Sequence, residues 1–200
     1  MTTDLITRLQ NVDLDAMAKT VYENAKRHGF HDGDKSMSHW LCLVICELSE
    51  AVEADRKGRR ANIEAFDRAM KEPVSPHEAA SPEEIYDHWF EAYIKDTLED
   101  ELADAAIRLL DLAATKDVMI TEAYTKYQSV YKCYFVQSWS FTEKIFIIEQ
   151  TIAESKFVSI SDVLYQIFCL AYSLGVDLFE YIEKKMTYNE HRPFKHGKEY

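Results

Sequence analysis

Glycine and proline are scarce along this chain, and that scarcity limits the folds it can adopt more than any other feature. Only 5 glycines and 4 prolines occur among 200 residues, whereas sheet-rich folds need both residue types at their many turns. Apolar residues recur at the spacing of an amphipathic helix along nearly the whole sequence. We therefore predict an all-α fold, a helical bundle.

The helices predicted from this periodicity cover residues 13–28, 38–57 and 92–115, with two or three more within 141–190. Gly29 and Gly58 end the first two, and Gly175 marks a break among the last. Three of the four prolines fall in the polar stretch 59–91, which predicts an irregular insertion with short helices. The length suits a single domain spanning 1–200.

Two pairs of segments resemble each other. ELADAAIRLLDLAATKDV (101–118) shares Asp, Leu and Ala positions with SISDVLYQIFCLAYSLGVD (159–177), and ICELSEAV (45–52) loosely matches EQTIAESK (149–156). Two interpretations stay open. Amphipathic helices often look alike, or the bundle is built from a duplicated helical hairpin whose degenerate second half has lost most of its acids.

Charge and composition exclude several classes of protein. The net charge of −12 argues against binding to nucleic acid, which needs clustered Lys and Arg. The apolar runs are too short for a bilayer span, and the start lacks the layout of a signal peptide. The four cysteines form no CxxC pair and are expected to be buried, reduced thiols. We expect a cytoplasmic protein that binds no membrane.

The first acidic pair lies in HWLCLVICELSEAV, residues 39–52. On a helical wheel Glu47 falls inside an apolar arc, and Glu50 projects on the same side one turn later. Two neighbouring carboxylates on such an arc repel each other and are costly to bury. A cation is expected to compensate both.

The second acidic pair lies in DTLEDELADAAIRLLDLA, residues 96–113. Glu101 falls within the apolar stripe of this helix and Asp104 lies at its edge, whereas Glu99 and Asp100 are expected to face solvent. Packed antiparallel, the two helices would bring four carboxylates together. Such hard oxygen ligands suit Mg²⁺, or Mn²⁺, better than zinc or a di-iron centre, since no histidine accompanies them.

These motifs, ELSE (47–50) and ELAD (101–104), resemble the ExxE…ExxD signature of the MazG-like all-α nucleoside triphosphate pyrophosphohydrolases. The segment KKMTYNEHRP (184–193) is similar to the Lys-x-x-x-Asn-x-x-Arg-Pro segment that closes the core in many members. The resemblance covers roughly residues 12–58 and 92–200. Small members of the family place their sites between subunits, so a homodimer is one expectation; a duplicated hairpin would instead give one competent site per chain.

The resemblance implies Mg²⁺-dependent hydrolysis of a nucleoside triphosphate to the monophosphate and pyrophosphate, with the α-phosphorus attacked by water. It implies that the metal is held by four matching acids, Glu47, Glu50, Glu101 and Asp104. One carboxylate could also act as general base, with Glu47 and Glu50 preferred.

A basic segment near the end of the chain could bind the substrate through Lys185, Asn189, Arg192 and Lys195, with Lys and Arg at the phosphates and Asn at the sugar or base. The same charges also suit a helix C-terminus. Lys57, Arg59 and Arg60 are further candidates for phosphate contacts, or simply a solvated loop.

Two other functions stay open on the sequence. The chain could be a non-catalytic helical module that binds a partner, or a different metal-dependent phosphohydrolase acting on cyclic or bis-phosphorylated nucleotides. Release of pyrophosphate separates the predicted reaction from the second alternative.

Overall fold

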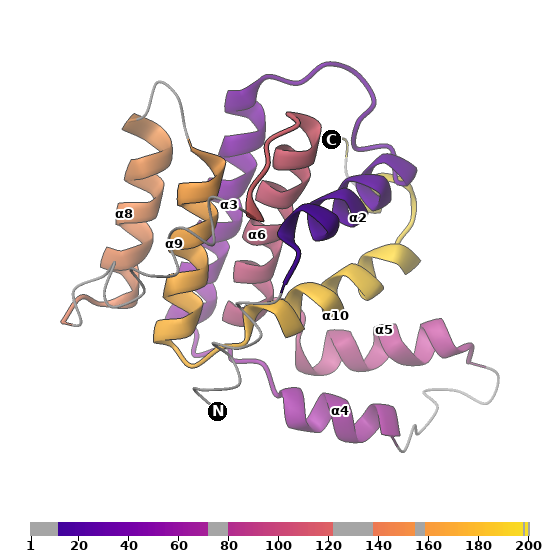
Figure 1. Cartoon of the computed structure of the whole chain (residues 1–200). Helices are drawn as coiled ribbons and strands as arrows, with labels where there is room; N and C mark the ends of the chain where they lie inside the picture. The colour runs from indigo at the N-terminus through magenta and orange to yellow at the C-terminus, as the bar shows by residue number, and fades with distance from the viewer. Residues whose placement is uncertain (1–11, 72–79, 122–137, 155–158, 198, 200) are drawn as a thin grey trace.

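The computed structural model describes residues 12–71, 80–121, 138–154, 159–197 and 199 (Figure 1). These residues contain helices and no strand, which confirms the predicted all-α bundle. The α-helices are α2 (Leu14–Arg27), α3 (Met37–Arg56), α4 (Ile63–Lys71), α5 (Pro82–Tyr93), α6 (Leu98–Thr115), α8 (Phe141–Glu154), α9 (Ile160–Ser173) and α10 (Leu178–His191), followed by a short 3₁₀ turn, η1 (Phe194–Gly197). No single described helix has the length and apolarity to cross a bilayer; α9 and α10 meet those criteria only as a pair bent by 110°.

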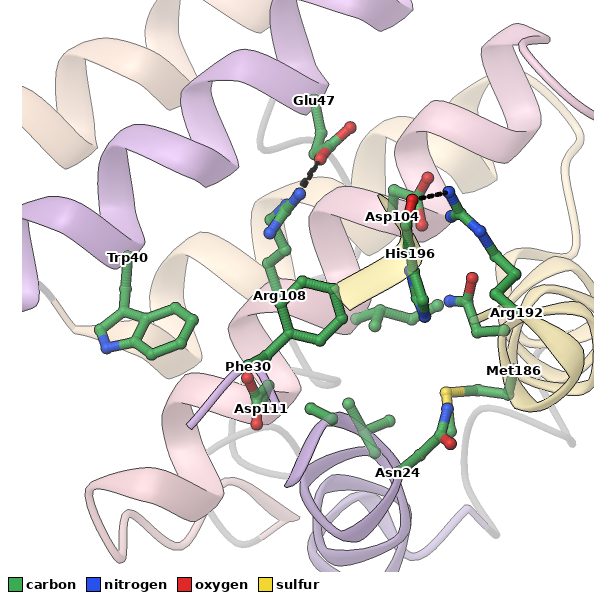
Figure 2. A pocket seen from close by; sticks show the side chains of 14 residues that line it. Asn24, Phe30, Trp40, Glu47, Asp104, Arg108, Asp111, Met186, Arg192 and His196 are labelled. Atoms are coloured by element: carbon green, nitrogen blue, oxygen red, sulfur yellow. Dashed lines mark hydrogen bonds and ion pairs between the residues drawn. The ribbon is translucent and has the colours of Figure 1, made fainter. Parts of the chain in front are cut away.

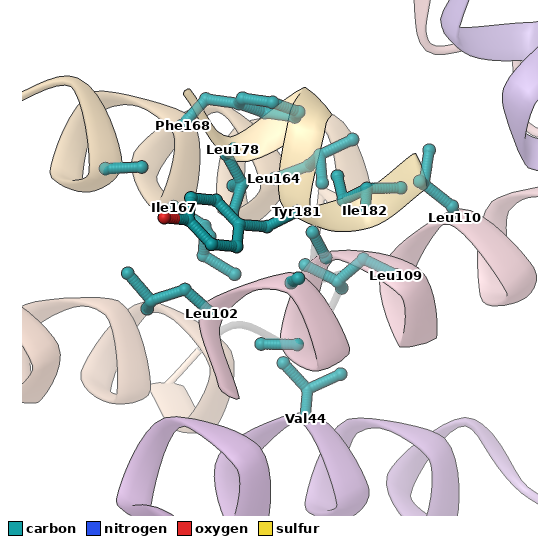
Figure 3. Packing of buried hydrophobic residues seen from close by; sticks show 14 of the residues in the cluster. Val44, Leu102, Leu109, Leu110, Leu164, Ile167, Phe168, Leu178, Tyr181 and Ile182 are labelled. Atoms are coloured by element: carbon teal, nitrogen blue, oxygen red, sulfur yellow. The ribbon is translucent and has the colours of Figure 1, made fainter. Parts of the chain in front are cut away.

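Helix α6 is the centre of the bundle and packs against α2, α3, α9 and α10. Helix α3 runs antiparallel beside it (Figure 1), as predicted for the two acidic helices. Leu102 and Leu109 of α6 are fully buried, and Figure 3 shows them between Val44 of α3 and the apolar side chains of α9 and α10. The core therefore consists mainly of aliphatic side chains around one helix, which holds α6 and its acids in a fixed register.

The helix predicted over 92–115 begins later, at Leu98, and this boundary was wrong. Helix α5 ends at Tyr93, with Ile94 as its C-cap residue. Asp96 then adopts a left-handed conformation with φ 58° and turns the chain. The Thr97 side chain then accepts a hydrogen bond from the Asp100 N–H and caps a new helix. Thr97 followed three residues later by an acid is an N-terminal signature, so the sequence carried this signal.

The stretch 59–91 contains the expected short helices, α4 and α5, and it braces α10. A capping box between Ser81 and Glu84 starts α5, with Pro82 at its first position. The Tyr86 hydroxyl donates to the Lys184 carbonyl at 2.8 Å, and the Tyr188 hydroxyl donates to Glu91 at 2.8 Å. Helix α5 is therefore a support for α10 rather than an independent insertion.

The cysteines differ from the expectation of buried thiols. Cys169 is buried, but Cys42 and Cys46 are exposed, and Cys133 lies outside the described residues. Cys42 and Cys46 are four residues apart on α3, on the side turned away from Val44 and Leu48 of the core. Most of the tyrosine-rich segment 124–139 also lies outside the described residues.

The central place of α6 predicts a large effect of shortening its buried side chains. Leu109→Ala removes part of a fully buried side chain, and we expect it to lower the free energy of unfolding by about 2–5 kcal/mol. Met119→Ala, at a side chain that is 68% exposed, is the control and should change it by less than about 0.5 kcal/mol. Urea denaturation followed by circular dichroism measures both. Equal midpoints for the two variants would contradict the assignment of α6 as the core helix.

Candidate functional site

The acids predicted from the two motifs lie together between α3 and α6. Glu47 and Glu101 are buried, Asp104 is half-buried and Glu50 is exposed. One carboxylate oxygen from each of Glu47, Glu50 and Glu101 lies within 4.8 Å of the others. Asp104 is instead bonded to a lysine, at 2.7 Å. The structure thus brings three of the four predicted acids into one cluster, with the fourth at its edge.

Arg108 holds Glu47 in place. Its Nε donates to Glu47 Oε1 at 2.6 Å, and a second nitrogen, Nη2, lies 2.5 Å from the same oxygen. Burial and the charge of Asp104 raise the pKa of Glu47, while Arg108 opposes that rise. Sequence analysis missed this arginine, although it stands one turn after Asp104 on the same helix face.

Lys185 of α10 is the counter-ion of the second acidic helix. Its side chain is 5% exposed, and its ammonium lies 2.9 Å from Asp100 and 2.7 Å from Asp104. Burial alone would lower the pKa of Lys185, but the two carboxylates raise it, so the side chain remains charged. Lys185 was predicted as a phosphate ligand; its three donors are instead turned into the acidic cluster.

Asp100 and Glu99 do not face solvent, and that expectation was wrong. Both are buried because α10 and the segment that follows α3 cover the first turn of α6. Glu99 accepts from Arg60 Nε at 2.6 Å and from the Ala61 N–H at 2.9 Å. Arg60 is therefore occupied within the fold and is a poor candidate for a phosphate contact.

Among the buried acids in the described part of the chain, Glu101 is the one whose carboxylate has no hydrogen bond or ion pair, and only the nearby charge of Lys185 acts to lower its pKa. The buried acids in the described residues are Glu47, Glu99, Asp100, Glu101 and Asp111. Asp111 bonds His31 at 2.8 Å, and the partners of the first three are given above. Glu101 makes no hydrogen bond or ion pair with the described part of the chain. Burial, and then the charges of Asp104 and Asp100, raise the pKa of Glu101 to about 9.

The oxygens of Glu47, Glu50 and Glu101 fit a small divalent cation. Two ligands of one magnesium ion lie at most about 4.2 Å apart, because Mg–O distances are about 2.1 Å. Three ligands of one octahedral ion cannot all be opposite one another, and adjacent ligands lie about 3 Å apart. The three oxygens, which lie within 4.8 Å of one another, therefore reach these positions through side-chain movements of up to about 1–2 Å. All of these donors are carboxylates, the ligand type that Mg²⁺ and Mn²⁺ prefer.

A pocket adjoins the cluster, and Glu47 and Asp104 line one side of it. Figure 2 shows Trp40 of α3 and Arg192, just past α10, facing this pocket from opposite sides. The remaining lining combines apolar side chains with two amides, an imidazole and the charged Arg108 and Asp111. It comprises Val21, Asn24, Ala25, Phe30, Ile107, Arg108, Asp111, Met186, Asn189 and His196. We call this space the inner pocket.

Asn189 is a buried polar group of the inner pocket whose side-chain oxygen has no partner among the described residues. Its side chain is 6% exposed, and its Oδ1 accepts no hydrogen bond. An unsatisfied buried carbonyl oxygen is costly, so it marks a place where a ligand could donate a hydrogen bond. Of the four predicted substrate ligands, Asn189 and Arg192 line this pocket. Lys195 lies elsewhere, with its ammonium 3.1 Å from the Glu199 carbonyl.

Comparison with models of protein families, with curated proteins and with solved structures gives no match for this chain. The functional argument therefore rests on the cluster and the inner pocket themselves.

The buried ammonium of Lys185 predicts that replacing Lys185 destabilises the fold far more than replacing the adjacent Lys184. Lys185→Met leaves Asp100, which is 1% exposed, without its counter-ion, and we expect a loss of about 3–5 kcal/mol in the free energy of unfolding. Lys184→Met removes a more exposed pair with Asp67 and should cost about 1 kcal/mol or less. Chemical denaturation at neutral pH measures both losses. Adding Asp100→Asn to Lys185→Met should recover part of the loss, whereas equal effects of the two lysines would refute this role.

The raised pKa of Glu101 predicts a pH-dependent stability. In the unfolded chain this group ionises near its ordinary pKa of 4.5, but in the folded chain only near 9. Between these values rising pH favours the unfolded state, by up to about 1.4 kcal/mol per pH unit, because only the unfolded chain releases the proton. In a chelator, Glu101→Gln should flatten the decline of the thermal midpoint over this pH window. Glu64→Gln, at an exposed position on α4, should leave the decline unchanged, and parallel curves for wild type and Glu101→Gln would contradict the prediction.

Proposed function

We propose that this protein hydrolyses nucleoside triphosphates to the monophosphate and pyrophosphate in a Mg²⁺-dependent reaction. The observation that carries the proposal is the position of three carboxylates, from two antiparallel helices, beside a pocket with aromatic and carboxamide walls. The motifs ELSE (47–50) and ELAD (101–104) support it further through their resemblance to the MazG-like pyrophosphohydrolases.

The inner pocket suits a nucleoside. Trp40 and Phe30 offer aromatic faces for a planar base, and Val21 and Met186 add apolar surface. Asn24 and Asn189 supply amides that can form hydrogen bonds with the polar edge of the base. The Oδ1 of Asn189 has no partner among the described residues and can accept a hydrogen bond from the base. A base bound there would leave its phosphates at Glu47 and Asp104, where the pocket meets the cluster.

Glu47, Glu50 and Glu101 would hold the metal ion. Bound magnesium supplies neutralisation of the phosphate charges and a lowered pKa for water. Lys185 keeps Asp104 beside this group, and Arg108 fixes the orientation of Glu47. The chain's own cations therefore position Glu47 and Asp104 before any ligand arrives, which is the preorganisation that phosphoryl chemistry requires. Glu50 and Glu101 keep their oxygens available to the metal.

Glu50 is the carboxylate that we assign as general base. It is exposed and has no hydrogen bond or ion pair with the described part of the chain, whereas Glu47 is held by Arg108. In the reaction a water oxygen bonds to the α-phosphorus as the water gives a proton to Glu50. The bond from that phosphorus to the α–β bridging oxygen breaks, and pyrophosphate leaves with its electron pair.

A product assay over a panel of nucleoside triphosphates tests the proposal. We expect monophosphate and pyrophosphate in equal amounts with Mg²⁺, and neither product in a chelator. Glu47→Gln, Glu50→Gln and Glu101→Gln should each lower kcat/KM at least about a hundredfold, since each removes a metal ligand or the base. Glu64→Gln, with the same charge change on α4, should retain wild-type activity.

Two outcomes would overturn the proposal. Release of inorganic phosphate without pyrophosphate would assign a different phosphohydrolase. No turnover of any nucleotide, together with no thermal shift on adding Mg²⁺ or Mn²⁺, would favour a non-catalytic module.

A further inference from the structure

The four acids of the two motifs are divided between two hollows. Glu47 and Asp104 line the inner pocket. Glu50 and Glu101 line a second, shallower depression at the C-terminal end of α3, together with Glu53, Ala54, Lys57, Arg59 and Asp96. We call this second hollow the outer depression. The four acids thus adjoin two hollows: the inner pocket has apolar, amide and charged side chains, and the outer depression is lined by charged side chains apart from Ala54.

Of the basic side chains around the outer depression, Arg59 is the one that the fold does not use. Lys57 is paired with Glu53 at 2.9 Å, and Arg60 is paired with Glu99 at 2.6 Å. The Arg59 guanidinium makes no hydrogen bond or ion pair with the described residues, although Lys57, Arg56 and Arg59 all help to lower the pKa of Glu53. An uncommitted arginine in a hollow with two of the cluster's acids is available to an anion.

The backbone of Arg59 is fixed even though its side chain is not engaged. Its N–H donates to the Ala54 carbonyl at 2.9 Å, and its carbonyl accepts from the Leu98 N–H at 3.2 Å. The turn that places it there uses Gly58 at φ 65°, a conformation that glycine adopts without strain. Arg59 is therefore anchored to the end of α3 and the start of α6, the two helices that carry the acids.

We propose that Arg59 binds the terminal phosphate of a nucleoside triphosphate, so that the substrate lies with its base in the inner pocket and its polyphosphate directed across the carboxylates into the outer depression. This assignment rests on the proposed function. The buried Oδ1 of Asn189, which has no partner in the described residues, indicates that the neutral base binds in the inner pocket. Arg59 indicates that the anionic terminal phosphate binds in the outer depression. Arginine matches phosphate oxygens with two parallel hydrogen bonds.

A substrate bound in this direction is selected by its number of phosphates. A diphosphate bound with its base in the inner pocket has no third phosphate to reach Arg59. The triphosphate gains a charge-assisted contact that the diphosphate cannot make, so Arg59 is a specificity-determining residue for the number of phosphates.

Steady-state kinetics on matched nucleoside tri- and diphosphates, with Mg²⁺, test the assignment. We expect Arg59→Gln to lower kcat/KM for the triphosphate about 10- to 100-fold, the loss expected for one charged hydrogen-bonding group. The value for the diphosphate should stay within about twofold. Arg68→Gln, with the same charge change at an exposed position on α4, is the control and should change neither value. Equal losses for both nucleotides, or no loss, would overturn the assignment.

Calorimetric titration of inorganic tripolyphosphate and of pyrophosphate into the protein, with Mg²⁺, separates this assignment from the proposed reaction. Arg59→Gln should weaken binding of tripolyphosphate about tenfold or more, and of pyrophosphate as well because pyrophosphate contains the terminal phosphate, whereas Arg68→Gln should weaken neither. If no nucleotide is hydrolysed but this selective weakening is seen, the reaction is wrong and Arg59 is still the polyphosphate ligand. If nucleotides are hydrolysed and tripolyphosphate binds both variants equally, the assignment of Arg59 is wrong and the reaction stands.

Discussion

The ion pairs of Lys185 with Asp100 and Asp104 are the interaction on which the rest of the site depends. They place one ammonium among carboxylates inside the bundle and fix α10 against the first turns of α6. Once α10 is fixed there, Asn189 and Arg192, further along the same segment, reach the inner pocket. Helix α5 supports the arrangement from the other side through Tyr86 and Glu91. A buried pair of this kind contributes little net stability, but removing one partner is severe, so its main effect is to define where α10 sits.

The pairing of buried carboxylates with cations also explains which of them keep an unbalanced negative charge. The chain gives Glu47 an arginine, Glu99 an arginine and Asp100 a lysine, each within hydrogen-bonding distance. Glu101 receives none, and in the absence of another cation it avoids the cost of ionisation by keeping its proton. The carboxylates of the cluster without a cationic partner in the described residues are therefore Glu101 and its neighbour Glu50. Both of these acids line the outer depression, and their carboxylates lie close to that of Glu47 in the inner pocket.

Periodicity predicted the acidic core of the site but not its counter-ions. The wheel positions of Glu47 and Glu101 within apolar arcs follow from helix geometry alone, and both are buried as predicted. Burial of Glu99 and Asp100 depends on which distant segments cover the start of α6, and no local pattern reports that.

The burial of Lys185, by contrast, had a signal in the sequence. The buried side chains of α10 include Leu178, Tyr181, Ile182, Lys185, Tyr188 and Asn189, spaced at three and four residues. Lys185 therefore occupies a position on the buried face of α10 where an apolar residue is expected. A lysine at such a position indicates a buried acidic partner. The pairing of Arg108 with Glu47 was equally open to inference from its place one turn after Asp104. The left-handed turn at Asp96 and the bracing role of α5 depend on tertiary contacts.

The ion pair of Lys185 with Asp100 joins two parts of the chain that lie far apart in the sequence. Lys185 and Asp100 are separated by 85 residues, so the acidic half of the centre is synthesised well before the ammonium that neutralises it. Until α10 docks, Asp100 and Asp104 either stay hydrated or take up protons, and the hollow beside them is open on one side. Contacts of such high sequence separation carry a loop-closure entropy that slows folding. Docking of α10 on α6 therefore completes the inner pocket, because Met186, Asn189 and Arg192 join its lining only then.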